Sequence, residues 1–158
     1  MLLYALGAFI SIIISGALYN KLGMKCLFII ALLLHSIGIS LLTLVNNNTD
    51  IPLLISTYLI IGVGGGIGAN TAQTTALYDF SAQKLVQASV IWNINRQVVF
   101  SVGATMVAML FNILSLFCLP QTAYKMTFLI YALIGILPLI LLLTLKKDVI
   151  TQEIQDEF

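Results

Sequence analysis

The sequence predicts an all-α fold, a polytopic transmembrane helix bundle of about five spans, and three observations lead to it. Of the 158 residues, 60% are hydrophobic and only 8% are charged, whereas a soluble domain carries about 25% charged residues. The mean hydropathy is +1.08. The apolar residues also gather in runs of about 20, the length that crosses a bilayer as a helix. A chain of this composition could not cover a surface that faces water.

Short polar segments divide the apolar sequence. They are a cationic turn near residue 20, a polar turn at 46–50, a polar loop at 79–87 and a short loop around Pro120. The predicted spans between them cover about 2–18, 26–45, 51–77, 88–116 and 126–145. These spans form one helical bundle over residues 1–145, and residues 146–158 form a charged tail.

The lysines of the short loops predict an orientation. One side of the membrane receives Lys21, Lys25, Lys84, Lys146 and Lys147, and the other side receives Lys125. Because cytoplasmic loops carry the excess of Lys and Arg, we expect the tail to be cytoplasmic and the N-terminus to lie outside.

The cationic turn between the first two spans carries a motif. Its residues are Gly16, Leu18, Asn20, Lys21, Gly23 and Lys25. The motif resembles the Gly-x-Leu-x-Asp-Arg-x-Gly-Arg-Lys signature of the major facilitator superfamily, which implies a conformational latch at a tight cytoplasmic turn. Asn20 stands where that family has an acid, and Met24 where a basic residue is common, so an ordinary cytoplasmic hairpin is the alternative.

The third span contains a glycine run followed by polar residues. Its members are Gly62, Gly64, Gly66, Gly68 and Asn70. The Gly-x-Gly-x-x-Gly fingerprint of dinucleotide binding is not met, because Ile67 occupies its third glycine position. Small residues four apart instead favour close helix packing. Two compatible interpretations follow: packing alone, or a bending helix whose polar face lines a transport pathway.

The fourth span carries Arg96, the most costly residue to place in a membrane. An arginine at the middle of a membrane helix costs about 2.5–3.5 kcal/mol. Asn93, Gln97 and Ser101 follow helical spacing and form a polar stripe with Arg96 at its edge, which we expect to face the bundle interior. This segment resembles the fifth helix of the C-terminal half in fourteen-span drug:proton antiporters. Arg96 then either lines a pathway or bonds carbonyls at a helix end.

Together the resemblances imply the C-terminal part of a facilitator-superfamily transporter of a bacterial cytoplasmic membrane. They imply proton-coupled efflux of a drug or another small apolar or cationic molecule. The chain would correspond to helices two to six of that half, a fragment or split half that is inactive alone. Its expected partners are the lipid bilayer and either a separate N-terminal half chain or a second copy.

Other classes of function have little support in the sequence. The predicted spans contain no Asp or Glu, so we expect no catalytic site, and we expect no metal, cofactor or nucleic acid. His35 is interpreted as a packed residue, as are Cys26 and Cys118. The alternative to a transporter is a small non-transporting membrane scaffold or subunit that packs through its glycine-rich helix faces.

Overall fold

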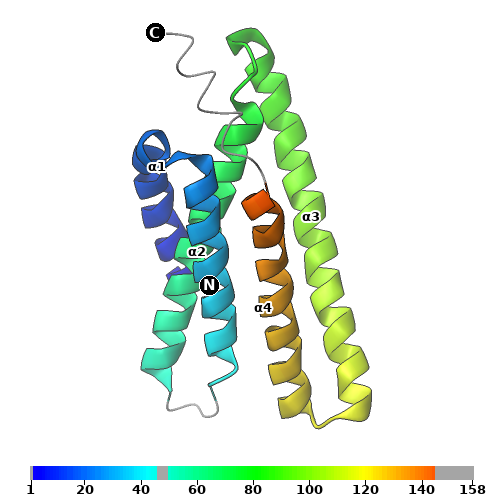
Figure 1. Cartoon of the computed structure of the whole chain (residues 1–158). Helices are drawn as coiled ribbons and strands as arrows, with labels where there is room; N and C mark the ends of the chain where they lie inside the picture. The colour runs from blue at the N-terminus through cyan, green and yellow to red at the C-terminus, as the bar shows by residue number, and fades with distance from the viewer. Residues whose placement is uncertain (1, 46–49, 145–158) are drawn as a thin grey trace.

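The computed structural model describes residues 2–45 and 50–144, and every regular element in these residues is a helix. Along the chain the helices are α1 (Leu2–Leu42), α2 (Ile51–Leu77), α3 (Ala82–Phe117) and α4 (Pro120–Thr144) (Figure 1). All four are long and apolar enough to cross a membrane. The predicted all-α class is confirmed, and the predicted tail at 146–158 lies outside the described residues.

α1 contains the first two predicted spans, because the chain reverses inside it at Gly23. Gly23 has φ 74° and ψ 161°, which is not a helical conformation. Glycine adopts such angles freely, whereas a side chain is strained there. As one straight helix the 41 residues of α1 would extend about 60 Å, twice the hydrocarbon thickness of a bilayer. The reversal gives instead a first limb, residues 2–22, and a second limb, residues 24–42 (Figure 1).

The bounds of the later helices differ in part from the predicted spans. α2 covers the predicted 51–77, whereas α3 begins at Ala82 rather than at 88, and α4 at Pro120 rather than at 126. The backbone amides of Lys84 and Leu85 donate to the carbonyl oxygen of Ser81 at 2.9 and 3.0 Å, which starts α3. Ala, Gln, Lys and Leu are good helix formers, so a polar composition at 82–87 did not mean a loop.

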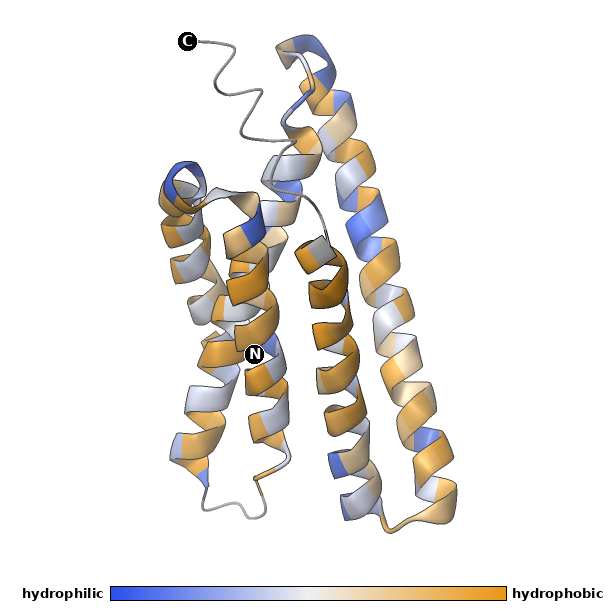
Figure 2. Ribbon diagram, viewed as in Figure 1, coloured by the Kyte–Doolittle hydropathy of each residue, from blue (hydrophilic) through white to orange (hydrophobic). Residues whose placement is uncertain are grey.

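Most buried side chains between the helices are small or polar, and most large apolar side chains lie outside. The buried polar residues are Ser11, Ser15, Ser36, Thr57, Thr71 and Thr127. Many leucine, isoleucine, valine and phenylalanine side chains are exposed, and Figure 2 shows the apolar residues along the outer faces of the helices. This distribution suits lipid, where an apolar exterior is stable and small residues let helices approach.

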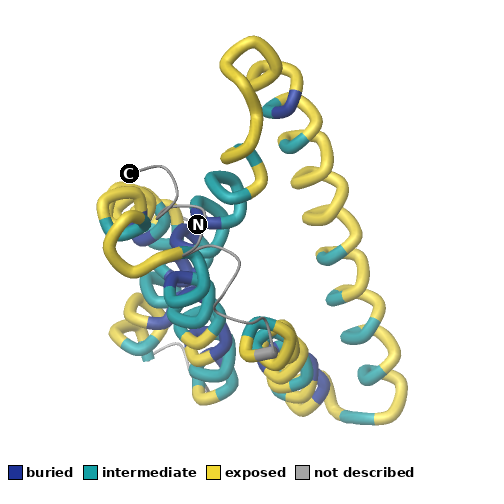
Figure 3. The backbone as a smooth tube through the Cα atoms, turned by 45° about the horizontal axis from the view of Figure 1, so that its top comes forward, coloured by how far each residue is buried: buried dark blue, intermediate teal, exposed yellow. Residues whose placement is uncertain are grey.

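The packing is concentrated around α1 and α2. A buried cluster of Leu27, Ala31 and Ile67 joins the second limb to α2. α4 contacts α1 and α3. α3 itself is exposed along nearly all of its length, and Ala88 is its one buried residue (Figure 3).

Candidate functional site

The glycine run lies in the part of α2 that packs between the two limbs of α1. Gly62 and Gly66 face the first limb: a Cβ on Gly62 would clash with the carbonyl oxygen of Tyr4, and one on Gly66 with the Oγ of Ser11. Gly64 faces the second limb, where a Cβ would lie 2.6 Å from the backbone nitrogen of His35. Residues two positions apart on a helix point about 200° away from each other. The alternating glycines therefore give α2 two close-packing faces.

Glycines of α1 make the reciprocal contacts with α2. A Cβ on Gly7 would lie 2.7 Å from the carbonyl oxygen of Leu59, and one on Gly38 would lie 2.6 Å from Cγ1 of Ile61. Gly68 is less tightly packed, since its Cβ would meet Ala31 at an ordinary 3.4 Å. Backbone contact is therefore closest at Gly62 and Gly64, and next closest at Gly66 and Gly7.

Hydrogen bonds link the polar end of α2 to the first limb. The Nδ2 of Asn70 donates to the Oγ of Ser15 at 2.9 Å and lies 3.5 Å from the carbonyl oxygen of Ile12. Farther along, the hydroxyls of Tyr19 and Thr75 are 3.1 Å apart. Inside a membrane such bonds hold neighbouring helices in register, so α2 and the first limb form one unit.

His35 contacts α2 from the second limb. Its Nδ1 lies 3.3 Å from the carbonyl oxygen of Ile61. The same residue supplies the backbone nitrogen that faces Gly64. This position agrees with a packed histidine.

The motif residues of the cationic turn are spread along the reversal of α1. Leu18 packs against the buried cluster of Leu27, Ala31 and Ile67. Asn20 and Lys21 are exposed, and Lys25 is half-buried. Gly16 is helical, and a Cβ there would have nothing within 4 Å, so Gly23 is the glycine that the turn requires.

The polar stripe of α3 does not meet the glycine run. Asn93, Arg96, Gln97 and Ser101 are all exposed, so within this chain the stripe does not face a bundle interior as expected. α3 packs on α4 and at its start on α2, which leaves the stripe uncovered. The hydroxyls of Ser101 and Thr105 donate to carbonyl oxygens one turn back, at 3.0 and 2.8 Å, as hydroxyls in apolar surroundings do.

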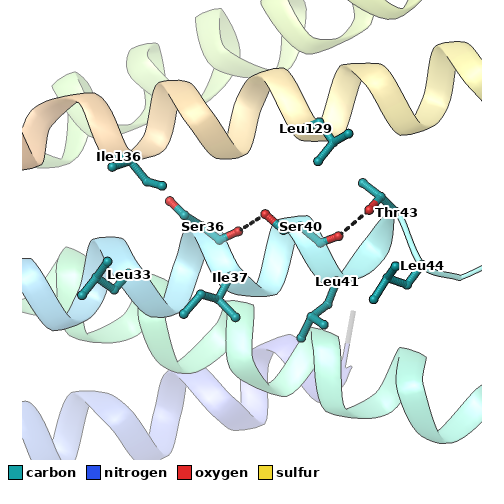
Figure 4. A pocket seen from close by; sticks show the side chains of 9 residues that line it. All are labelled: Leu33, Ser36, Ile37, Ser40, Leu41, Thr43, Leu44, Leu129 and Ile136. Atoms are coloured by element: carbon teal, nitrogen blue, oxygen red, sulfur yellow. Dashed lines mark hydrogen bonds between the residues drawn. The ribbon is translucent and has the colours of Figure 1, made fainter.

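A cavity of about 370 Å³ lies between the second limb of α1 and α4 (Figure 4). Two of its hydroxyls are bonded within the limb: Ser40 donates to the carbonyl oxygen of Ser36 at 2.9 Å, and Thr43 to that of Ser40 at 2.6 Å. The Ser36 hydroxyl is buried and has no hydrogen-bond partner among the described residues. The Ser36 hydroxyl faces α4, where a Cβ on Gly135 would lie 2.9 Å from it. The rest of the lining is leucine and isoleucine, so this cavity offers an apolar surface and no reactive group.

Three residues of the α1–α2 interface were not predicted from any motif: Gly7, Ser11 and Ser15. They are four positions apart on the first limb, and this small-xxx-small spacing is the signal that identifies them. Among residues 2–45 and 50–144, no group of three or more His, Cys, Asp or Glu side chains could hold a metal ion.

The chain matches the family described as PUCC protein over residues 2–149. No curated protein and no solved structure matches it. The match covers both limbs of α1, all of α2 and α3, and all of α4. The chain therefore belongs to the PUCC protein family, whose membrane proteins are related to the transporters of the major facilitator superfamily.

Proposed function

We propose that this chain forms the C-terminal part of a secondary transporter of the facilitator type. In this proposal the complete transporter moves a small apolar or cationic molecule out of the cell in exchange for protons. The family match supports membrane transport. It carries no information about drug efflux, so the substrate class and the proton coupling rest on the resemblance to fourteen-span antiporters.

The uncovered polar stripe of α3 is the observation that supports this function best. A helix in contact with lipid on all sides gains nothing from an arginine and three polar neighbours, and such residues are costly there. A helix that borders a solvated pathway gains polar contacts to substrate and water. Asn93, Arg96, Gln97 and Ser101 are all exposed, so they are accessible to a second helical half.

In the proposed transporter, α1 and α2 form the rigid unit beside that pathway. Backbone contacts at Gly62, Gly64 and Gly66 leave no room for the helices to slide without separation. The bond between Asn70 and Ser15 fixes their register. The reversal at Gly23, with Lys21 exposed beside it, is the position of the proposed latch.

The alternative function is a scaffold that packs on other proteins through its glycine-rich faces. Those faces are already covered within this chain. Gly62, Gly64 and Gly66 are in contact with α1 of the same chain. A partner could not use these faces unless α1 first separated from α2. The observations therefore favour the transporter.

The test begins with gentle extraction of the chain from its own membrane and measurement of its native mass. The proposal predicts a stable complex with a second helical chain or with another copy. That complex, reconstituted into vesicles with a pH gradient, should move a cationic dye such as ethidium. The monomeric chain, reconstituted in the same way, should not. Dye transport by the monomer, or no dye transport by the complex under a pH gradient, would contradict the proposal.

A further inference from the structure

A second cavity, of about 350 Å³, lies where α2 ends and α3 begins. Its lining is mostly apolar and includes Leu77, Phe80 and Ile91. On α3 it also includes Lys84, Trp92 and Asn95, which recur at helical spacing on one face of the helix. The cavity thus combines an apolar surface with side chains that donate hydrogen bonds.

Trp92 lines this cavity and carries a hydrogen-bond donor without a partner among the described residues. This donor, Nε1, is shielded from solvent. An indole N–H donates and never accepts, and a buried donor without an acceptor is unfavourable. The ammonium group of Lys84 likewise only donates. The complementary ligand therefore presents oxygen acceptors, at least one of them negatively charged.

The spacing of these donors indicates how such a ligand lies. At 1.5 Å per residue, Lys84 and Trp92 are about 12 Å apart along the axis of α3. A single small anion is too short to contact both donors, whereas an amphiphile with a charged head group and an ester group below it can reach both. Tryptophan and lysine are also the residues that gather at the boundary between membrane and water.

The charged side chains at this end of the bundle include lysines and Asp79, which lies in the loop between α2 and α3. The bond between Tyr19 and Thr75 joins the cationic turn of α1 to this end of α2. Lys21 and Lys84 therefore belong to the same end of the bundle. Basic residues at a membrane surface attract anionic lipids, and at this end of the bundle Lys21 and Lys84 outnumber Asp79.

We propose that this cavity binds an anionic phospholipid. The lipid phosphate pairs with Lys84, an ester carbonyl oxygen accepts the hydrogen of Trp92 Nε1, and the acyl chain begins at the level of Ile91 and continues toward the membrane interior. Leu77 and Phe80 lie beside the head region of the lipid. The lipid fastens the start of α3 to the end of α2. This site is independent of the proposed transport function, because neither the polar stripe of α3 nor the substrate enters the argument.

Trp92 makes the proposal testable, since it is the single tryptophan of the chain. The purified chain is placed in phosphatidylcholine nanodiscs that contain equal fractions of either brominated phosphatidylglycerol or brominated phosphatidylcholine. Bromine quenches tryptophan fluorescence on contact. We expect Trp92 to be quenched at several-fold lower fractions of the brominated phosphatidylglycerol. Equal quenching by the two lipids would overturn the proposal.

Two variants examine the named contacts. Lys84→Gln should abolish the preference for phosphatidylglycerol, whereas Lys21→Gln, at the same membrane end but outside the cavity, should lower it only in part, because long-range attraction is lost but the contact in the cavity remains. Trp92→Phe should retain less phosphatidylglycerol than the unchanged chain in native mass spectrometry. A preference that survives Lys84→Gln, with helix content unchanged by circular dichroism, would contradict the site.

Free phosphate is the other source of the same anion. Excess inorganic phosphate should leave the preference in place, relative to chloride of equal ionic strength, because the acyl chain and the ester belong to the ligand. If inorganic phosphate removes the preference, the cavity holds a free anion and the lipid assignment is wrong.

Discussion

Gly64 of α2 and His35 of α1 are in backbone contact: a Cβ on Gly64 would lie 2.6 Å from the amide nitrogen of His35 and 3.0 Å from its Cα. Two positions away in each direction, Gly62 and Gly66 meet the other limb of α1. The alternation lets one helix pack backbone to backbone against two neighbours. In a membrane, where lipid competes with protein for apolar contacts, such close approach drives helix association.

Gly64→Ala should therefore destabilise the bundle by about 1–3 kcal/mol, the usual cost of an overpacked site. The neighbouring atoms belong to the backbone of His35 and Ala31 and cannot rotate away. Gly103→Ala is the matched control, because nothing lies within 4 Å of its Cβ position. Unfolding in mixed detergent measures both variants. Equal stability of the two would show that α2 and the second limb do not pack as described.

Alanine substitution at the two glycines of the cationic turn should change the stability of the bundle in opposite directions. Gly23→Ala forces a side chain onto φ 74°, which costs about 1–3 kcal/mol. Gly16→Ala lies inside helical backbone with open space around it and should stabilise by about 0.5–1 kcal/mol. Thermal unfolding of both variants in detergent gives the comparison. A shift of the same sign for both would mean that the chain does not reverse at Gly23.

Asn70→Ala should weaken the contact between α2 and the first limb by about 0.5–1.5 kcal/mol. The substitution removes the donor to the Ser15 hydroxyl, 2.9 Å away. Ser15→Ala and the double variant complete a thermodynamic cycle, whose coupling energy we expect near 0.6 kcal/mol, the average for such bonds in membranes. Strictly additive effects would mean that Asn70 and Ser15 do not interact.

Much of the fold follows from the sequence, because lipid imposes a simple pattern on it. Apolar length and the small-xxx-small spacing at Gly62, Gly64 and Gly66 are local properties, so helices and their close contacts could be predicted. The starts of α3 and α4 could not be predicted from polarity. The start of α3 follows from the helix propensity of residues 82–87, and the start of α4 follows from Pro120 in its first turn.

The candidate site could be predicted only in part. Its two parts, the glycine run of α2 and the polar stripe of α3, depend on contacts with different neighbours. The glycine run finds its neighbours in α1, and Ser11 and Ser15 were recognisable by spacing. The stripe at Asn93, Arg96, Gln97 and Ser101 stays exposed among the described residues. Periodicity identifies such a face, but it carries no information about what covers the face.

Arg96→Ala tests what the exposed face of α3 does. Because Arg96 is exposed, the substitution should change the stability of the isolated chain by less than about 0.5 kcal/mol. In the proposed transporter it should lower dye transport by the reconstituted complex roughly tenfold, the equivalent of about 1.4 kcal/mol. Arg96→Lys keeps the charge but not the planar donor array. Partial transport by this variant would show that the positive charge is what transport requires. No transport would show that the guanidinium group itself is required. Unfolding in detergent and dye transport under a pH gradient are measured on the same preparations. A stability loss in the isolated chain above about 1 kcal/mol would mean that Arg96 supports the fold itself, and unchanged transport by Arg96→Ala would remove the residue from the pathway.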